Sequence, residues 1–176
     1  GIMSNNSIQL SIITFDHKAE ICIDDINSTQ LDLPDNDTIN NWCEPRDITR
    51  LYDTVIEAVN NQKLRMQKRK SAMPKMLREL DPVFERCIYV LTDGVDNASY
   101  KTSQDMKDLL EKERKNGLKT IFLAANQDAV KQAQNFGFDP KTALTIGSDA
   151  ITSAIGMNFA NQMARNISSN TSDDGI

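Results

Sequence analysis

The order of the apolar segments constrains this chain more than any other feature of its sequence. Short apolar stretches at residues 86–92, 118–124 and 143–146 alternate with stretches whose apolar side chains recur at helical spacing. Parallel strands need a crossover connection, and a helix usually supplies it. The alternation therefore predicts an α/β fold, with a doubly wound, mostly parallel sheet and helices on both of its faces.

The first part of the chain predicts an antiparallel hairpin at the edge of this sheet. Residues 8–15 and 19–23 are rich in isoleucine, and Asp16-His17-Lys18 lies between them as a turn. Residues 24–48 are polar and predict a loop.

Two further helices complete the predicted layers. One runs from residue 48 to about 64, and Thr49 stands at its start, where a hydroxyl group commonly caps a helix. Another begins at Ser148 and carries apolar residues at steps of four. We assign residues 1–167 to one domain and residues 168–176 to a flexible polar tail.

Charge and composition exclude several classes of function. The formal net charge is −5 and the isoelectric point is near 4.9, so we expect no nucleic-acid partner. One local exception is a basic run between residues 63 and 78, which predicts a solvated helical face or, alternatively, a docking patch for anions. No apolar run reaches the roughly 18 residues that span a bilayer, and we expect no membrane partner.

Cysteine and histidine usage favours a cytoplasmic protein and argues against two kinds of site. The three cysteines, Cys22, Cys43 and Cys87, are widely spaced and form no metal-binding pair. His17 is the only histidine, which argues against a zinc site and against a Ser-His-Asp triad.

Four segments in order resemble the von Willebrand factor A (vWA) family. The apolar strand that ends in Thr92-Asp93-Gly94 resembles its strand-end motif, and Ile48-Thr49-Arg50-Leu51-Tyr52-Asp53 resembles the start of its second helix. Residues 10–16 resemble its second strand, and residues 124–137 resemble a later strand–helix unit. The resemblance covers about residues 8–166 and implies a vWA/Rossmann-like fold.

The resemblance implies a protein–protein interaction module and no enzymatic activity. In that family a divalent cation at the carboxyl end of the sheet accepts an acidic side chain from the partner. Carried over to this chain, the metal ligands would be the Thr49 hydroxyl and the Asp93 carboxylate. Such oxygen ligands suit Mg²⁺, and also Mn²⁺ or Ca²⁺.

One part of the family pattern is missing. The chain contains no Asp-x-Ser-x-Ser motif and no counterpart of the family's first, central strand. Metal binding is therefore expected to be weak or absent, and the sheet is expected to contain a gap. Three explanations of the missing first strand stay open. The strand would lie in another segment of the protein, or it would come from a partner or from a strand-exchanged protomer in a homo-oligomer. In the third explanation, the sheet is rebuilt without it.

Other interpretations of these residues stay open. Thr49 also fits a helix cap, Asp93 fits a turn, and Asp53 fits support of a neighbouring loop. A metal-independent structural or assembly protein is the main alternative function. A Mg²⁺-dependent phosphoryl-transfer enzyme built on Asp93 and Asp96 is the third, although the chain has no glycine-rich phosphate loop.

Overall fold

The computed structural model describes most of the chain from residue 8 to residue 146. The described residues are 8–32, 34–42, 48–82, 84–92, 96–125 and 128–146. Asp93, the predicted helix that begins at Ser148 and the predicted tail lie outside them. Asn126, which the sequence predicts to cap a short helix, lies outside them too.

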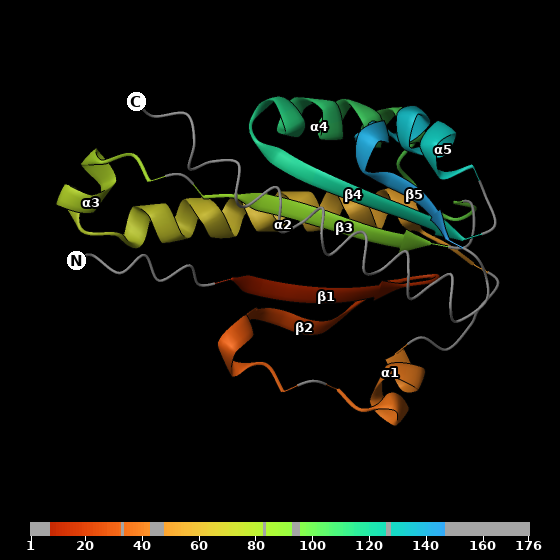
Figure 1. The fold of residues 1–176 in the computed structure, drawn as a ribbon, viewed down its shortest axis with the longest axis horizontal. Helices are drawn as coiled ribbons and strands as arrows, with labels where there is room; N and C mark the ends of the chain where they lie inside the picture. Colours follow the sequence, from red (N-terminus) through yellow and green to blue (C-terminus); the bar gives the residue numbers. More distant parts are fainter. Residues whose placement is uncertain are drawn as a thin grey trace.

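The described strands form two separate sheets (Figure 1). In the first, β1 (Gln9–Phe15) pairs with β2 (Ala19–Asn27) in antiparallel fashion, as the hairpin pattern predicts. In the second, β3 (Arg86–Thr92), β4 (Leu118–Ala125) and β5 (Ala143–Ile146) are parallel and lie in that order. The α/β class and the parallel sheet are thus confirmed. The predicted place of the hairpin at the edge of the parallel sheet is wrong, because the described hairpin pairs with no strand of that sheet.

The helices agree with the sequence pattern except near the hairpin. They are α1 (Asn36–Trp42), α2 (Leu51–Ala72), α3 (Lys75–Glu79), α4 (Ser103–Lys115) and α5 (Ala129–Phe136), with short 3-10 turns η1 (Ser28–Gln30) and η2 (Pro140–Thr142). The predicted loop at residues 24–48 contains α1, which buries no side chain and therefore has no apolar periodicity to reveal it. The helix predicted at residues 48–64 continues to Ala72, through basic residues whose composition is helix-prone up to Pro74.

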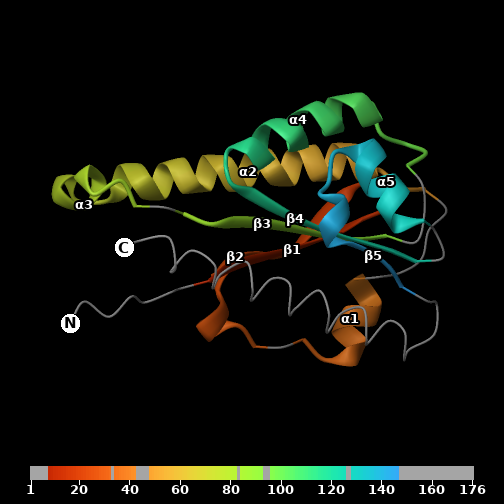
Figure 2. The same cartoon turned by 45° about the horizontal axis from the view of Figure 1, so that its top comes forward.

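Helices α2, α4 and α5 cover one face of the parallel sheet, as Figure 2 shows. Their apolar side chains meet those of β3 and β4 in a single core. Its largest fully buried members are Leu51, Val59, Met106, Leu110, Phe122 and Phe138. No described helix is both long enough and apolar enough to cross a membrane.

The near-continuous apolar run at residues 86–92 predicts a strand buried on both faces, and this prediction is wrong. Among the described strands β3 lies at the edge of the parallel sheet, and its buried side chains all lie on one face. On the other face Tyr89 and Leu91 keep 39% and 46% of their surface exposed. The central strand β4 is the one buried on both faces, with Phe122 toward the helices and Ile121 and Leu123 on the other side.

Helix α2 connects the two sheets through polar side chains. The Gln62 amide donates to the carbonyl of Cys87 on the outer edge of β3, at 3.1 Å. One turn further on, Arg65 bonds to Ser11 of β1 at 2.8 Å and also to Asp24 of β2. Arg69 pairs with Asp25, also on β2. Part of the basic run therefore fastens the hairpin to α2.

A buried carboxylate ties α2, β3 and α4 together. Glu113 of α4 has only 1% of its side chain exposed, and its two oxygens accept from Lys63 at 2.7 Å and from Arg86 at 2.9 Å. Burial favours the neutral acid, but the two bonds outweigh it and hold the pKa of Glu113 below its usual value. Arg86 is itself buried, so Glu113 is the counter-ion for a charge withdrawn from water.

We expect Glu113→Gln to lower the free energy of unfolding by about 3 kcal/mol, because it leaves Arg86 charged and buried without a counter-ion. Urea unfolding at neutral pH measures the change. The control Glu111→Gln, on an exposed part of α4, should cost less than about 0.5 kcal/mol.

The pH dependence gives the same test a second readout. Because the folded pKa of Glu113 is lowered, its stabilising contribution is complete above the unfolded pKa. It is lost as the pH falls through the folded pKa. The gap between wild type and Glu113→Gln should therefore close in acid, and a gap that stays constant would contradict the role of the charge.

Candidate functional site

The start of α2 lies against the loop that follows β3, as the sequence predicts. The Thr49 amide donates to Asn97 Oδ1 at 2.8 Å, and the Thr49 carbonyl accepts from the amides of Asn97 and Ala98 at 3.1 and 3.2 Å. Thr49 is half-buried there. The structure thus places one predicted ligand at the carboxyl end of β3, while Asp93 falls outside the described residues.

The first turn of α2 is capped by this loop. The alternative interpretation of Thr49 as the helix cap is wrong, since Arg50 occupies the N-cap position and its side chain makes no capping bond. Instead, the Tyr52 amide donates to Asp96 Oδ2 and the Asp53 amide donates to Ser99 Oγ, both at 3.0 Å. A side chain 44 residues away in sequence therefore satisfies the exposed end of the helix.

Asp53 fastens the loop from the other side. Its carboxylate accepts from the amides of Tyr100 and Lys101 at 3.0 and 2.9 Å, and from the Arg50 guanidinium at 2.5 Å. Burial alone would raise the pKa of Asp53, but these bonds outweigh it and keep the pKa below its usual value. Asp53 supports the loop, as one of its sequence interpretations states.

Arg50 joins a third segment to this arrangement. Its amide donates to the carbonyl of Asp16 in the hairpin turn at 2.9 Å. Its guanidinium bonds to Asp53 and lies 5.0 Å from the centre of the Tyr100 ring. The hairpin turn, the start of α2 and the loop at residues 96–102 are therefore held as one surface, which we call the carboxyl-end face.

The carboxyl-end face displays an aromatic ring on a fixed backbone. Tyr100 has 89% of its surface exposed, although its amide is bonded to Asp53 and its ring lies beside Arg50. Lys101 next to it is also exposed, and its amide is bonded as well. Both side chains thus project from a loop whose main chain is held in place.

The described acids on this face are not free to hold a metal ion. Both oxygens of Asp96 accept hydrogen bonds, from Ser99 and Tyr52, and both oxygens of Asp53 accept from Arg50 and the loop amides. Over the described ranges, no group of three or more acidic, histidine or cysteine side chains could bind a metal. Thr49 offers a single hydroxyl, so these residues by themselves do not fit a cation site.

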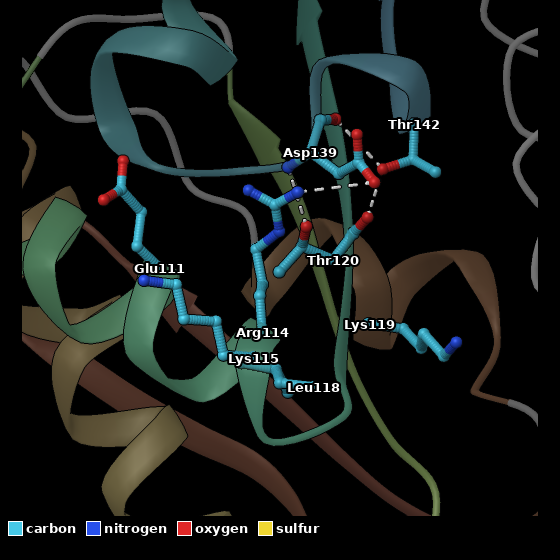
Figure 3. A pocket seen from close by; sticks show the side chains of 8 residues that line it. All are labelled: Glu111, Arg114, Lys115, Leu118, Lys119, Thr120, Asp139 and Thr142. Carbon is cyan, nitrogen blue, oxygen red and sulfur yellow. Dashed lines mark hydrogen bonds and ion pairs between the residues drawn. The ribbon is translucent and has the colours of Figure 1, made fainter.

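A separate cavity of about 520 Å³ opens at the other end of the sheet (Figure 3). Its polar groups bond mainly to one another. Arg114 pairs with Asp139 at 3.4 Å, the Asp139 amide donates to the Thr120 hydroxyl at 3.0 Å, and Thr142 bonds to the Thr120 carbonyl. The cavity is also lined by basic residues at the end of α4, Arg114 and Lys115. Basic residues are common at this position, because the carboxyl end of a helix is the negative end of its dipole.

Sequence reasoning missed Arg50, Ser99 and Tyr100 as members of the site. Asp96 and Ser99 carry a local signal, since an acid followed three residues later by serine is a common turn. That signal does not show which helix the turn will cap. The loop meets α2 only in the folded chain. The hydrogen-bond partners of Asp96 and Ser99 could therefore not be predicted from the sequence pattern.

Comparison of the chain with protein-family models, with curated proteins and with solved structures finds no match. Functional inference therefore rests on the sequence and on the geometry of the carboxyl-end face.

We expect Asp96→Ala to destabilise the protein by about 1–2 kcal/mol, the usual cost of removing a helix cap. Thermal unfolding measures the loss, and hydrogen exchange should be faster at the Tyr52 amide. Asp108→Ala is the matched control, because Asp108 is an exposed acid on α4 that accepts from Gln104. Equal effects of the two variants would contradict the capping role.

Proposed function

We propose that this chain is a protein–protein interaction module of the vWA type, which binds its partner at the carboxyl-end face. The finer fold assignment, a doubly wound vWA/Rossmann-like sheet, belongs to the same proposal. The observation that carries it is Tyr100, an aromatic side chain 89% exposed on a loop whose main chain is fastened to α2. We further propose that the protein acts in the cytoplasm.

A fixed loop with an exposed tyrosine has the physical properties of a binding surface. Binding costs free energy when a loop must first be ordered, and here hydrogen bonds to Asp53 and Asp96 already order it. Tyrosine and arginine are the residues most often found at the energetic centre of protein interfaces. Lys101 and Arg50 favour an acidic group on the partner.

Binding explains this face better than catalysis does. A phosphoryl-transfer site would need Asp96 as a metal ligand, but Asp96 accepts from Tyr52 and Ser99 and so completes the helix cap. We assign Mg²⁺, or Mn²⁺ or Ca²⁺, only an auxiliary role. Thr49 and Asp93 would then hold the ion weakly, with further oxygen ligands supplied from outside the described residues.

The test is a selection of displayed random peptides on the purified chain. We expect the selected peptides to carry carboxylates and to bind Tyr100→Ala at least about tenfold more weakly, because the tyrosine ring is the central contact. The affinity of each peptide for wild type and variant is measured by calorimetry.

Val130→Ala provides the control, since Val130 is an exposed side chain of α5 outside the carboxyl-end face. Peptides that bind Tyr100→Ala as tightly as wild type would place the interaction elsewhere. Each titration is repeated with Mg²⁺, with chelator and with Asp93→Ala. Affinity that does not respond to these changes would remove the metal from the proposal.

A specific observation also favours a second candidate function, assembly by strand addition. Within the described residues, no ladder joins the β1–β2 hairpin to the parallel sheet, so β3 is an edge strand. Edge strands recruit other strands through their main-chain groups. The gap that the sequence predicts is in keeping with this arrangement, and a second copy of the chain could supply the strand.

If copies assemble in this way, sedimentation should show a dimer or larger species that Leu91→Pro converts to a monomer. The Cys87 carbonyl bonds to Gln62 on the outer edge of β3, so the Leu91 amide, four residues further along the strand, points to the same edge. Proline there removes an outer donor and keeps the bonds to β4. A wild-type chain that is monomeric at high concentration would end this second candidate.

A further inference from the structure

The basic run that sequence analysis singled out ends in a projecting arm. We define the arm as residues 64–80, the last turns of α2 together with α3. Figures 1 and 2 both show α3 and the end of α2 beyond the ends of the strands. The arm is thus a feature separate from the carboxyl-end face, which lies at the opposite end of α2.

Large apolar side chains of the arm face solvent. Met76 and Leu80 each have 75% of their surface exposed, and they stand four residues apart at α3, where side chains share one face. Leu64 and Leu77 are 48% and 46% exposed. Several exposed apolar side chains close together indicate an interaction site.

The arm also carries exposed cations. Lys68, Lys75 and Arg78 are exposed. Two lysines of the arm pair with acids that are themselves exposed. Lys70 pairs with Asp81, whose side chain is 85% exposed, and Lys75 lies 3.8 Å from the exposed Glu79. Exposed pairs of this kind contribute little and can exchange partners. By contrast Arg65 and Arg69 are committed to the hairpin.

We propose that the arm adsorbs onto an anionic lipid surface, with Met76, Leu77 and Leu80 entering the headgroup region and Lys68, Lys75 and Arg78 facing the lipid phosphates and carboxylates. Clustered basic residues are attracted to anionic leaflets, and apolar side chains on the same element add to the binding. This is peripheral adsorption, for which no membrane-spanning segment is needed, and it does not depend on the proposed function of the carboxyl-end face.

Charge and shape favour a lipid surface over a protein partner. The chain as a whole carries −5, but α2 has 22 residues and a length of about 33 Å. That length exceeds the Debye length of about 8 Å, so the arm's own cations dominate the potential at its tip. Residues 64–80 contain no aromatic side chain of the kind that centres protein interfaces, and flexible methionine, leucine and lysine suit a fluid surface.

The test is flotation of the full chain with vesicles of phosphatidylcholine, with and without phosphatidylserine. We expect the chain to float with the anionic vesicles only, and less of it to float as salt is added. Lys75→Glu/Arg78→Glu should weaken the binding more than about tenfold, since each basic residue near the surface contributes several-fold. Met76→Ser/Leu80→Ser should weaken binding to a similar extent.

The matched control is Val130→Ser/Lys131→Glu, the same kinds of change at an exposed position of α5, and it should float like wild type. Circular dichroism confirms that each variant is folded. Failure to float with anionic vesicles, or equal losses in the control, would overturn the proposal. So would a chain that binds soluble polyglutamate but no vesicles, because that result would point to an acidic protein partner.

Discussion

Helix α2 is the element on which the rest of the structure depends, because it contacts every other described layer. Its first turn is capped by the loop after β3, its apolar side packs in the core, and its second half holds the hairpin. No strand ladder joins the two described sheets. The two sheets are therefore joined by side-chain bonds from α2 and not by a main-chain ladder. These bonds come from Gln62, Arg65 and Arg69.

The same helix has a charged partner at each level. At its start, the carboxylate of Asp96 accepts from an amide of α2, and the carboxylate of Asp53 accepts from amides of the loop. At its middle, Glu113 neutralises Lys63 and Arg86, and its burial makes this the pairing with the largest energetic consequence. Toward its end the cations become exposed, and their pairs contribute little to stability. The charges of α2 thus change from buried to exposed along the helix, and its exposed end is the part for which we propose lipid binding.

Much of the fold could be predicted because hydrophobic periodicity is local. The strands at residues 86–92, 118–124 and 143–146 and the helix after Ser103 follow from the spacing of apolar residues alone. Short α1 was missed because it buries nothing, and β3 was assigned two buried faces because its composition does not reveal its place in the sheet. For the site, the resemblance placed Thr49 at the carboxyl end of β3. Arg50 and Tyr100 gave no signal, and the turn signal of Asp96 and Ser99 did not show which helix they cap.

The sequence by itself determined the α/β class, the hairpin and the basic run, since each depends on neighbours within a few residues. It also determined the acidic net charge, which is a sum over the chain. Only the tertiary structure decided that Asp96 and Ser99 cap a helix more than 40 residues away. It also decided that β3 is an edge strand among the described strands, and that part of the basic run forms ion pairs with the hairpin. These features depend on which segments meet in space, and packing of the whole core determines that.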